Sequence, residues 1–189
     1  SSHNTLSHNT ASNCSQGFRL HYSSNNVLSG NNAVNNTMGI TLYSSSDNFL
    51  SGNNVTANIA EGILILNLSR KNTLSGNIIS GNGEGIHLIS SSDNVVSGNN
   101  VTANGIGILF ESSSGNTVSG NIFAENGSAI YFDSSLNNSI LHNSFVNNTS
   151  QVFTWSSGAI WDDGYPSGGN FWSDYNGTDA DHDGIGDTA

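Results

Sequence analysis

Apolar and asparagine positions recur along this chain with a period of about 22 residues. The phrase N-x-[aliphatic]-[SL]-[GH]-N is repeated, and its closing asparagine falls at positions 9, 31, 53, 77, 99, 121 and 143. All steps between these positions are 22 residues except one of 24, which is too regular for a bias in composition. A repeat of this length is one supersecondary unit that buries its apolar face by stacking on its neighbours.

Four apolar columns run through the repeats. The first contains Leu6, Leu28, Leu50, Leu74, Val96, Val118 and Ile140. The second contains Ala11, Ala33, Val55, Ile79, Val101, Phe123 and Phe145. The third and fourth lie two residues apart, in pairs that run from Phe18 and Leu20 in the first repeat to Val152 and Thr154 in the last. Alternation with a period of two is typical of a short strand with one buried face.

Several short strands in each repeat, with glycine and asparagine at the corners and no helical period, predict one coil of a parallel β-helix. The predicted fold is all-β: a right-handed parallel β-helix of about seven 22-residue coils, closed by an aromatic C-terminal cap. At the usual strand spacing it would be roughly 34 Å long. We expect the asparagine columns to form amide ladders at the bends, because a side-chain amide both donates and accepts hydrogen bonds and asparagine tolerates a left-handed backbone.

The composition changes after Thr154, which divides the chain into a β-helix, residues 1–155, and a C-terminal cap, residues 156–189. A β-helix must cover the open end of its last coil, where core side chains and strand edges would otherwise meet water. The aromatic side chains suited to form this lid are Trp155, Trp161, Tyr165, Phe171, Trp172 and Tyr175. The same rings could instead stack on a sugar.

The chain ends in an acidic loop of the form D-x-D-x-D-G-x-G-D. Carboxylates at alternate positions converge when such a loop wraps around a hard cation, and Ca²⁺, which takes many oxygen ligands, fits best. The predicted structural Ca²⁺ site consists of Asp179, Asp181, Asp183, Ile185 and Asp187. The loop resembles that of thrombospondin type 3 repeats, and a solvated acidic tail is the alternative.

The coils together with the ending G-G-N-F-W-S-D-Y…D-G-I-G-D resemble the NosD-type β-helix proteins, particularly those on the surface of methanogenic archaea. The resemblance covers essentially the whole chain. The family takes its name from a periplasmic copper-maturation factor, so copper has to be considered. The six histidines are scattered over different columns, and neither Cys14 nor Met38 joins them at a ligand-like spacing, so the residues do not support copper binding.

Charge and composition exclude other classes of function. Lys and Arg number three against 14 Asp and Glu, so the chain cannot neutralise a phosphate backbone, and nucleic-acid binding is set aside. No apolar run could span a membrane and no leader opens the chain, so we expect the mature form of an extracellular or cell-surface protein. Cys14 is the single cysteine. Candidate glycosylation sites in N-x-[ST] context are Asn35, Asn54, Asn67, Asn100, Asn126 and Asn176.

Many β-helix proteins act on polysaccharides, so an enzyme is the main alternative to a structural role. Two acidic pairs share columns on neighbouring coils, Glu61 with Glu84 and Glu111 with Asp133, and both pairs are expected to face outward. Neither pair has a basic residue in the same or a neighbouring column, and no coil carries the long loops that form a cleft. We therefore expect no catalysis, and a carbohydrate-binding or polysaccharide-modifying β-helix of the lyase, hydrolase or epimerase type remains the alternative.

The first coil begins without a helix to cover it, and an uncovered coil is an adhesive edge. The predicted assembly surface consists of Leu6, Phe18 and Leu20 at this end and the aromatic cap at the other. Such a head-to-tail contact does not close, so it builds a filament or an envelope lattice, with other copies, envelope components or a glycan as partners. The predicted function is a non-catalytic, calcium-stabilised structural protein of a cell-surface layer or extracellular filament.

Overall fold

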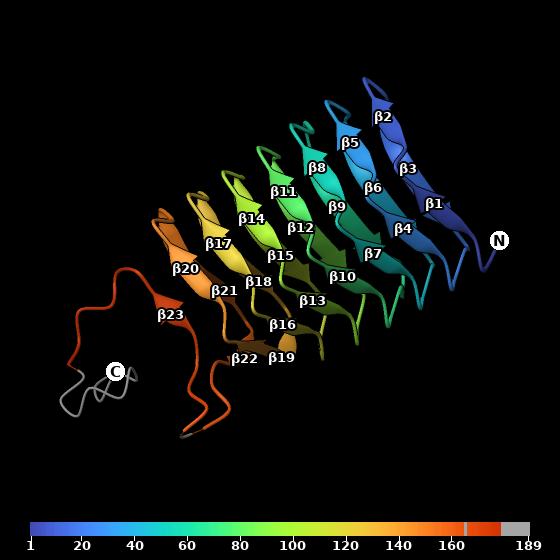
Figure 1. Ribbon diagram of the computed structural model, residues 1–189. Coiled ribbons are helices and arrows are strands. Elements are labelled where there is room, and N and C mark those ends of the chain that lie inside the picture. Colours follow the sequence, from blue (N-terminus) through green and yellow to red (C-terminus); the bar gives the residue numbers. More distant parts are fainter. Residues whose placement is uncertain (165, 179–189) are drawn as a thin grey trace.

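The computed structural model describes residues 1–164 and 166–178, and this part of the chain forms a parallel β-helix (Figure 1). Coil stacks on coil from the N-terminus at one end to the cap segment at the other, and each complete coil gives one strand to each of three sheets. The predicted parallel β-helix is confirmed. Among the described residues there is no helix that could cross a membrane.

The three sheets are parallel throughout. The first sheet contains β1 (Thr5–Ser7), β4 (Val27–Ser29), β7 (Phe49–Ser51), β10 (Thr73–Ser75), β13 (Val95–Ser97), β16 (Thr117–Ser119), β19 (Leu136–Leu141) and β22 (Gly158–Ile160). The second contains β2 (Thr10–Ser12), β5 (Asn32–Val34), β8 (Asn54–Thr56), β11 (Ile78–Ser80), β14 (Asn100–Thr102), β17 (Ile122–Ala124), β20 (Ser144–Val146) and β23 (Phe171–Trp172). The third contains β3 (Gln16–His21), β6 (Met38–Tyr43), β9 (Glu61–Leu66), β12 (Glu84–Ile89), β15 (Ile106–Glu111), β18 (Ser128–Asp133) and β21 (Ser150–Trp155).

The apolar columns form the core in the register that the repeats predict. Leu74 pairs with Leu50 on one side and Val96 on the other, and each is fully buried. The coils toward the cap hold stacked rings, with centroids 4.9 Å apart for Phe110 and Phe132. Identical or similar side chains in one column thus contact each other over the length of the solenoid, which is the packing that a repeat needs in order to bury its core.

The asparagine columns form the expected amide ladders. Asn77, for example, donates from Nδ2 to Oδ1 of Asn99 at 2.8 Å and to the carbonyl oxygen of Leu50 at 3.0 Å. Its own Oδ1 accepts from the backbone N–H and the side-chain amide of Asn53, both at 2.9 Å. Buried serines make a similar ladder that the sequence analysis did not expect: the N–H of Ser45 donates to Oγ of Ser69 at 2.9 Å.

The left-handed residues lie elsewhere than predicted. Each ladder asparagine was expected to adopt the left-handed backbone itself, but positive φ falls on the residue before it, such as Asp47 (φ 55°) before Asn48 and Gly52 (φ 59°) before Asn53. The sequence prediction is wrong on this point. The left-handed residue turns the chain, and the asparagine that follows directs its amide into the bend, where it is buried.

The two additional residues of the third coil, which contains β7, β8 and β9, are accommodated in its bends. Ile59 is 79% exposed and Leu68 is 65% exposed, and both lie outside the strands. Asn67 and Leu68 are consecutive left-handed residues (φ 58° and 61°). Because the two additional residues lie in the bends, β9 stays in register with β12. The outward-facing columns of the third sheet therefore continue without a shift past the third coil.

The cap continues the stacking beyond residue 155. β22 and β23 add one more rung to the first and second sheets. Trp172 stacks on Phe145 with centroids 4.3 Å apart, and Trp161 meets Phe132 edge-on at 6.1 Å. These two tryptophans therefore cover the last coil as expected of a lid.

Candidate functional site

Chemically distinctive side chains gather on the outer surface of the third sheet, which we call the outer face. One outward column contains Arg19, Thr41, Leu64, His87, Leu109, Tyr131 and Phe153. A second contains His21, Tyr43, Leu66, Ile89, Glu111, Asp133 and Trp155. Glu61 and Glu84 occupy neighbouring rungs at the start of their strands.

A histidine lies among the acidic residues at the middle of this face. Nδ1 of His87 is 2.8 Å from Oε2 of Glu84, and Nε2 is 3.5 Å from Oε2 of Glu111. Glu61 completes the group, because one ligand atom each from Glu61, Glu84 and His87 lie within 4.8 Å of one another. The group thus joins three successive coils through β9, β12 and β15.

An inward-facing glycine, which recurs in neighbouring strands of the third sheet, brings Glu84 and His87 to the same face of β12. Strict alternation would place residues three apart on opposite faces of a strand. Here Ile86 is fully buried, and a Cβ added to Gly85 would also point inward, 3.1 Å from Cγ1 of the core residue Val101. Two consecutive residues face the interior, so Glu84 before them and His87 after them both face outward.

The histidine is deeply buried and its ring is poorly satisfied. The His87 side chain is 8% exposed, and neither ring nitrogen makes a hydrogen bond to a described residue. Nδ1 lies close to Oε2 of Glu84, but the angle at Nδ1 does not suit a hydrogen bond. The contact is therefore electrostatic, and it does not satisfy the hydrogen-bonding capacity of Nδ1. Oε2 of Glu61 is likewise buried without a hydrogen bond among the described residues.

Like charges lie close together in this group. Carboxylates on neighbouring rungs, such as Glu61 and Glu84, are about one strand spacing apart, roughly 4.8 Å. Two negative charges at such a separation repel by about 1 to 4 kcal/mol, depending on how well water screens them. The arrangement therefore costs free energy unless a positive charge lies between the carboxylates.

The role of His87 was not predicted from the sequence. The prediction that no basic residue lies near either acidic pair is wrong, because His87 contacts one member of each pair. That prediction counted only arginine and lysine as basic residues, and histidine was considered only as a copper ligand. A histidine two positions before the column of Glu111, and in the same predicted strand as Glu84, was the available signal.

Aromatic side chains occupy both ends of the outer face. Tyr131 and Phe153 stack with centroids 4.6 Å apart, and Trp155, one column away, is 65% exposed. At the other end His21 packs against Tyr43, with centroids 4.9 Å apart. Trp155 was expected in the lid, but it extends this aromatic group instead, because its position in β21 faces outward.

The remaining predicted sites are distributed as follows. The Ca²⁺ residues 179–187 and Tyr165 lie outside the described residues. Phe171 and Tyr175 are 60% and 44% exposed at the cap. The prediction that Asn126 is a glycosylation site is wrong, because this side chain is buried. Its Nδ2 donates hydrogen bonds to the carbonyl oxygen of Val101 and to Oδ1 of Asn148. The other described candidates for glycosylation are exposed or half-buried: Asn35, Asn54, Asn67, Asn100 and Asn176.

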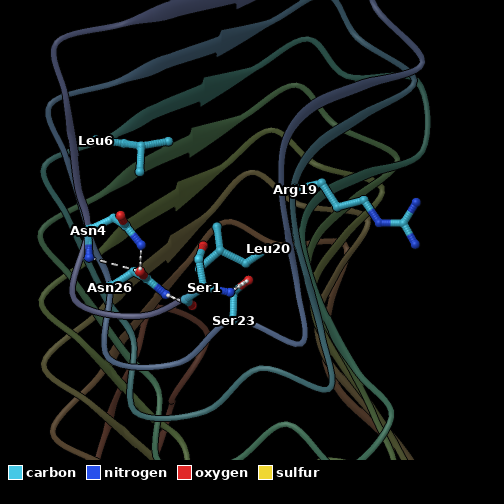
Figure 2. A pocket seen from close by; sticks show the side chains of 7 residues that line it. All are labelled: Ser1, Asn4, Leu6, Arg19, Leu20, Ser23 and Asn26. Atoms are coloured by element: carbon cyan, nitrogen blue, oxygen red, sulfur yellow. Dashed lines mark hydrogen bonds between the residues drawn. The ribbon is translucent and has the colours of Figure 1, made fainter.

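The open end of the first coil contains a hollow of about 180 Å³. Figure 2 shows Leu6 and Leu20 pointing into this hollow, while Arg19 projects away from it toward the outer face. Phe18 and Leu6 are only partly buried here, whereas their column partners in the second to sixth coils are fully buried.

Comparison with known proteins places the chain among β-helices. A family model described as "Periplasmic copper-binding protein (NosD)" matches residues 1–127 and, in an overlapping match, 64–177. No curated protein matches this chain in sequence. A mutant of the periplasmic alginate epimerase AlgG has a TM-score of 0.66 and 20% identity, covering 82% of this chain and 45% of that one. The A-module of the Azotobacter vinelandii mannuronan C-5 epimerase AlgE4 has a TM-score of 0.61 and 17% identity, covering 82% and 57%. The chain thus spans about half the length of these structures, and the likeness shows the fold.

Proposed function

The chain belongs to the NosD family, and on that premise we propose that it is a non-cytoplasmic β-helix that binds an extended, uncharged polysaccharide along the outer face. The observation that carries this proposal is the row of aromatic side chains at both ends of the face, with hydrogen-bonding groups between them. A non-cytoplasmic location is supported by the periplasmic description of the family and of the AlgG structure.

The shape of the outer face suits a long, flat ligand. Its strands run across the solenoid axis, so the face extends along the axis in steps of about 4.8 Å. From β6 with Tyr43 to β21 with Phe153 there are five steps, about 24 Å. Exposed rings at both ends offer apolar surface to sugar rings, and an exposed aromatic patch rimmed by polar groups marks an interaction site.

The charge of the face selects an uncharged ligand. Glu61, Glu84, Glu111 and Asp133 face outward, and the chain as a whole carries a formal charge of −11. Arg19, at one end, is the fixed positive charge among the outward columns of the described strands. A polyuronate such as alginate would be repelled along most of this length, so this chain should differ in ligand from the epimerases whose fold it shares.

The burial of His87 favours binding without cleavage. A general acid or base must come within hydrogen-bond reach of the substrate. Both ring nitrogens of His87 are buried beneath the outer face, with Glu84 and Glu111 beside them. We therefore keep the prediction that the chain is non-catalytic as part of this proposal. Its basis is now the burial of His87, because a basic residue does lie beside the acidic pairs.

The copper in the family description can be compared with the residues of this chain. Cu(I) prefers thiolate and thioether ligands, whereas imidazole and carboxylate suit divalent ions. The three side chains of the group, Glu61, Glu84 and His87, supply oxygen and nitrogen atoms and no sulfur. These residues fit Cu(II) or a similar divalent ion in donor type and charge, and they do not fit Cu(I).

Binding is tested by titrating the chain with soluble galactomannan, xyloglucan and mixed-linkage glucan, with alginate as the charged comparison, all in the presence of a chelator. We expect binding to an uncharged polymer, and about a fivefold loss of affinity, roughly 1 kcal/mol, for Trp155→Ala and again for Tyr131→Ala. Phe49→Ala is the matched control, because Phe49 is 42% exposed on the first sheet.

Three results contradict the proposal. One is that the chain binds none of the uncharged polymers. A second is tighter binding of alginate than of any uncharged polymer while the chelator is present. The third is that Trp155→Ala and Phe49→Ala weaken binding to the same extent, which would mean that the outer face is not the binding surface.

End-to-end association is a second candidate function, favoured by the hollow at the first coil. A further coil stacked there, whether from a longer form of the same chain or from a second copy, would fill the hollow against Leu6 and Leu20 and pair with β1, β2 and β3. The aromatic cap of a second copy is the surface that would meet the first coil. This arrangement corresponds to the structural, filament-forming role expected from the sequence, and it is compatible with polysaccharide binding on the outer face.

A further inference from the structure

We propose that Glu61, Glu84 and His87 bind a divalent transition-metal ion such as Zn²⁺, which ties the third coil of the solenoid to the fourth. The three residues supply two carboxylates and one imidazole, and their ligand atoms lie within 4.8 Å of one another. The metal proposal goes beyond polysaccharide binding and does not depend on it.

The unsatisfied atoms point to a ligand. The His87 side chain is more than nine-tenths buried, and its two ring nitrogens and Oε2 of Glu61 lack hydrogen bonds to the described residues. Buried polar atoms in native proteins nearly always have a partner, and where no side chain or backbone group supplies one, a water molecule or an ion does. Between two carboxylates, a cation also removes their mutual repulsion.

The spacing of the group is compatible with one ion. Zinc lies about 2.0–2.2 Å from nitrogen and oxygen ligands, so two ligands of a tetrahedral ion are about 3.3 Å apart. The group is compact enough for this value: His87 Nδ1 lies 2.8 Å from Glu84 Oε2, and all three ligand atoms lie within 4.8 Å of one another. Glu61 and Glu84 are half-buried, so an ion would be held between side chains that solvent partly reaches.

Glu111 supports the histidine from the other side. A metal-bound histidine usually donates its second ring N–H to a carboxylate or carbonyl oxygen, which fixes the ring and its tautomer. With the ion on Nδ1, the Nε2–H of His87 faces Oε2 of Glu111 at 3.5 Å. The structure therefore contains both the ligands and the outer carboxylate of such a site.

The donor set selects the class of metal. Calcium and magnesium prefer oxygen ligands alone, and Cu(I) prefers sulfur. A mixed set of imidazole and carboxylates suits Zn²⁺ and neighbouring divalent ions. Because the site is largely covered, the ion would be structural, and it would fasten the irregular third coil to the regular coil that follows.

The test uses the whole chain, stripped of metal and kept in excess Ca²⁺ so that the acidic C-terminal loop is saturated. Calorimetry with Zn²⁺ should give one site per chain, and Co²⁺ should give visible absorption bands typical of a protein-bound ion. His87→Leu should abolish both signals. Leu64 and Leu109 flank His87 in its column, so leucine fits the fold there. Glu84→Gln is a second variant that should also abolish binding.

Two further variants separate this site from adventitious binding. Glu111→Gln should keep the site but weaken it about tenfold or more, as loss of an outer carboxylate does. His142→Leu should bind Zn²⁺ like the unaltered chain, because His142 pairs with Asp163 at the cap, far along the solenoid. If the unaltered chain binds no Zn²⁺, or if His87→Leu binds it as tightly, the proposal is wrong.

Discussion

A substitution inside one asparagine ladder tests the energetic basis of the fold. Asn77 is fully buried in the middle of its ladder, where its amide makes four hydrogen bonds. Asn77→Ala removes both the donor and the acceptor. It leaves the carbonyl of Leu50, the N–H of Asn53 and one amide hydrogen of Asn53 buried without those partners.

The expected loss follows from these orphaned groups. A buried polar group left without a hydrogen bond costs about 1–3 kcal/mol. Three such groups, allowing for partial relaxation, should lower the free energy of unfolding by about 3–6 kcal/mol, a large part of the 5–15 kcal/mol that is typical of domains. The control is Asn9→Ala in the same column, because Asn9 is exposed at the end of the ladder and donates from its amide to Asn31 alone. There we expect a loss below about 1 kcal/mol.

The assay is urea unfolding, with the free energy extrapolated linearly to water, together with hydrogen exchange of the backbone amide of Asn53. Hydrogen exchange is needed because a solenoid can open locally without unfolding completely. The amide of Asn53 should lose protection in Asn77→Ala and keep it in Asn9→Ala. Equal losses in the two variants, or a loss below about 1 kcal/mol for Asn77→Ala, would show that the ladders contribute little.

Two predictions remain from the ends of the chain. If Asp179, Asp181, Asp183 and Asp187 bind Ca²⁺, chelation should lower the melting temperature and added Ca²⁺ should restore it. An unchanged calorimetric transition in excess chelator would show that the loop is only an acidic tail. Phe18→Lys should abolish any association of copies seen by sedimentation, because it places a charge on the open first coil, while circular dichroism stays unchanged. Association that persists in this variant would exclude the first coil as the contact.

The fold was predictable from the sequence alone, because the repeat specifies how the coils stack. A regular spacing of Leu, Val, Ile and Phe positions fixes which side chains stack, since a shift by one residue would turn every core side chain outward. Asparagine at a fixed place in each bend likewise determines the ladders, because each amide needs an equivalent amide on the next rung. These are short-range requirements repeated along the chain, so sequence spacing is enough to see them.

The acidic pairs of the candidate site were visible in the sequence, but only the tertiary structure showed that His87 joins them. Glu61, Glu84, His87 and Glu111 come from three coils, and their meeting depends on the inward turn at Gly85 and Ile86, which strict alternation does not predict. The same holds for Trp155, which the composition assigned to the lid and β21 places on the outer face. A repeat specifies what all coils share, whereas a site arises from differences between coils, and those become neighbours only when the coils are stacked.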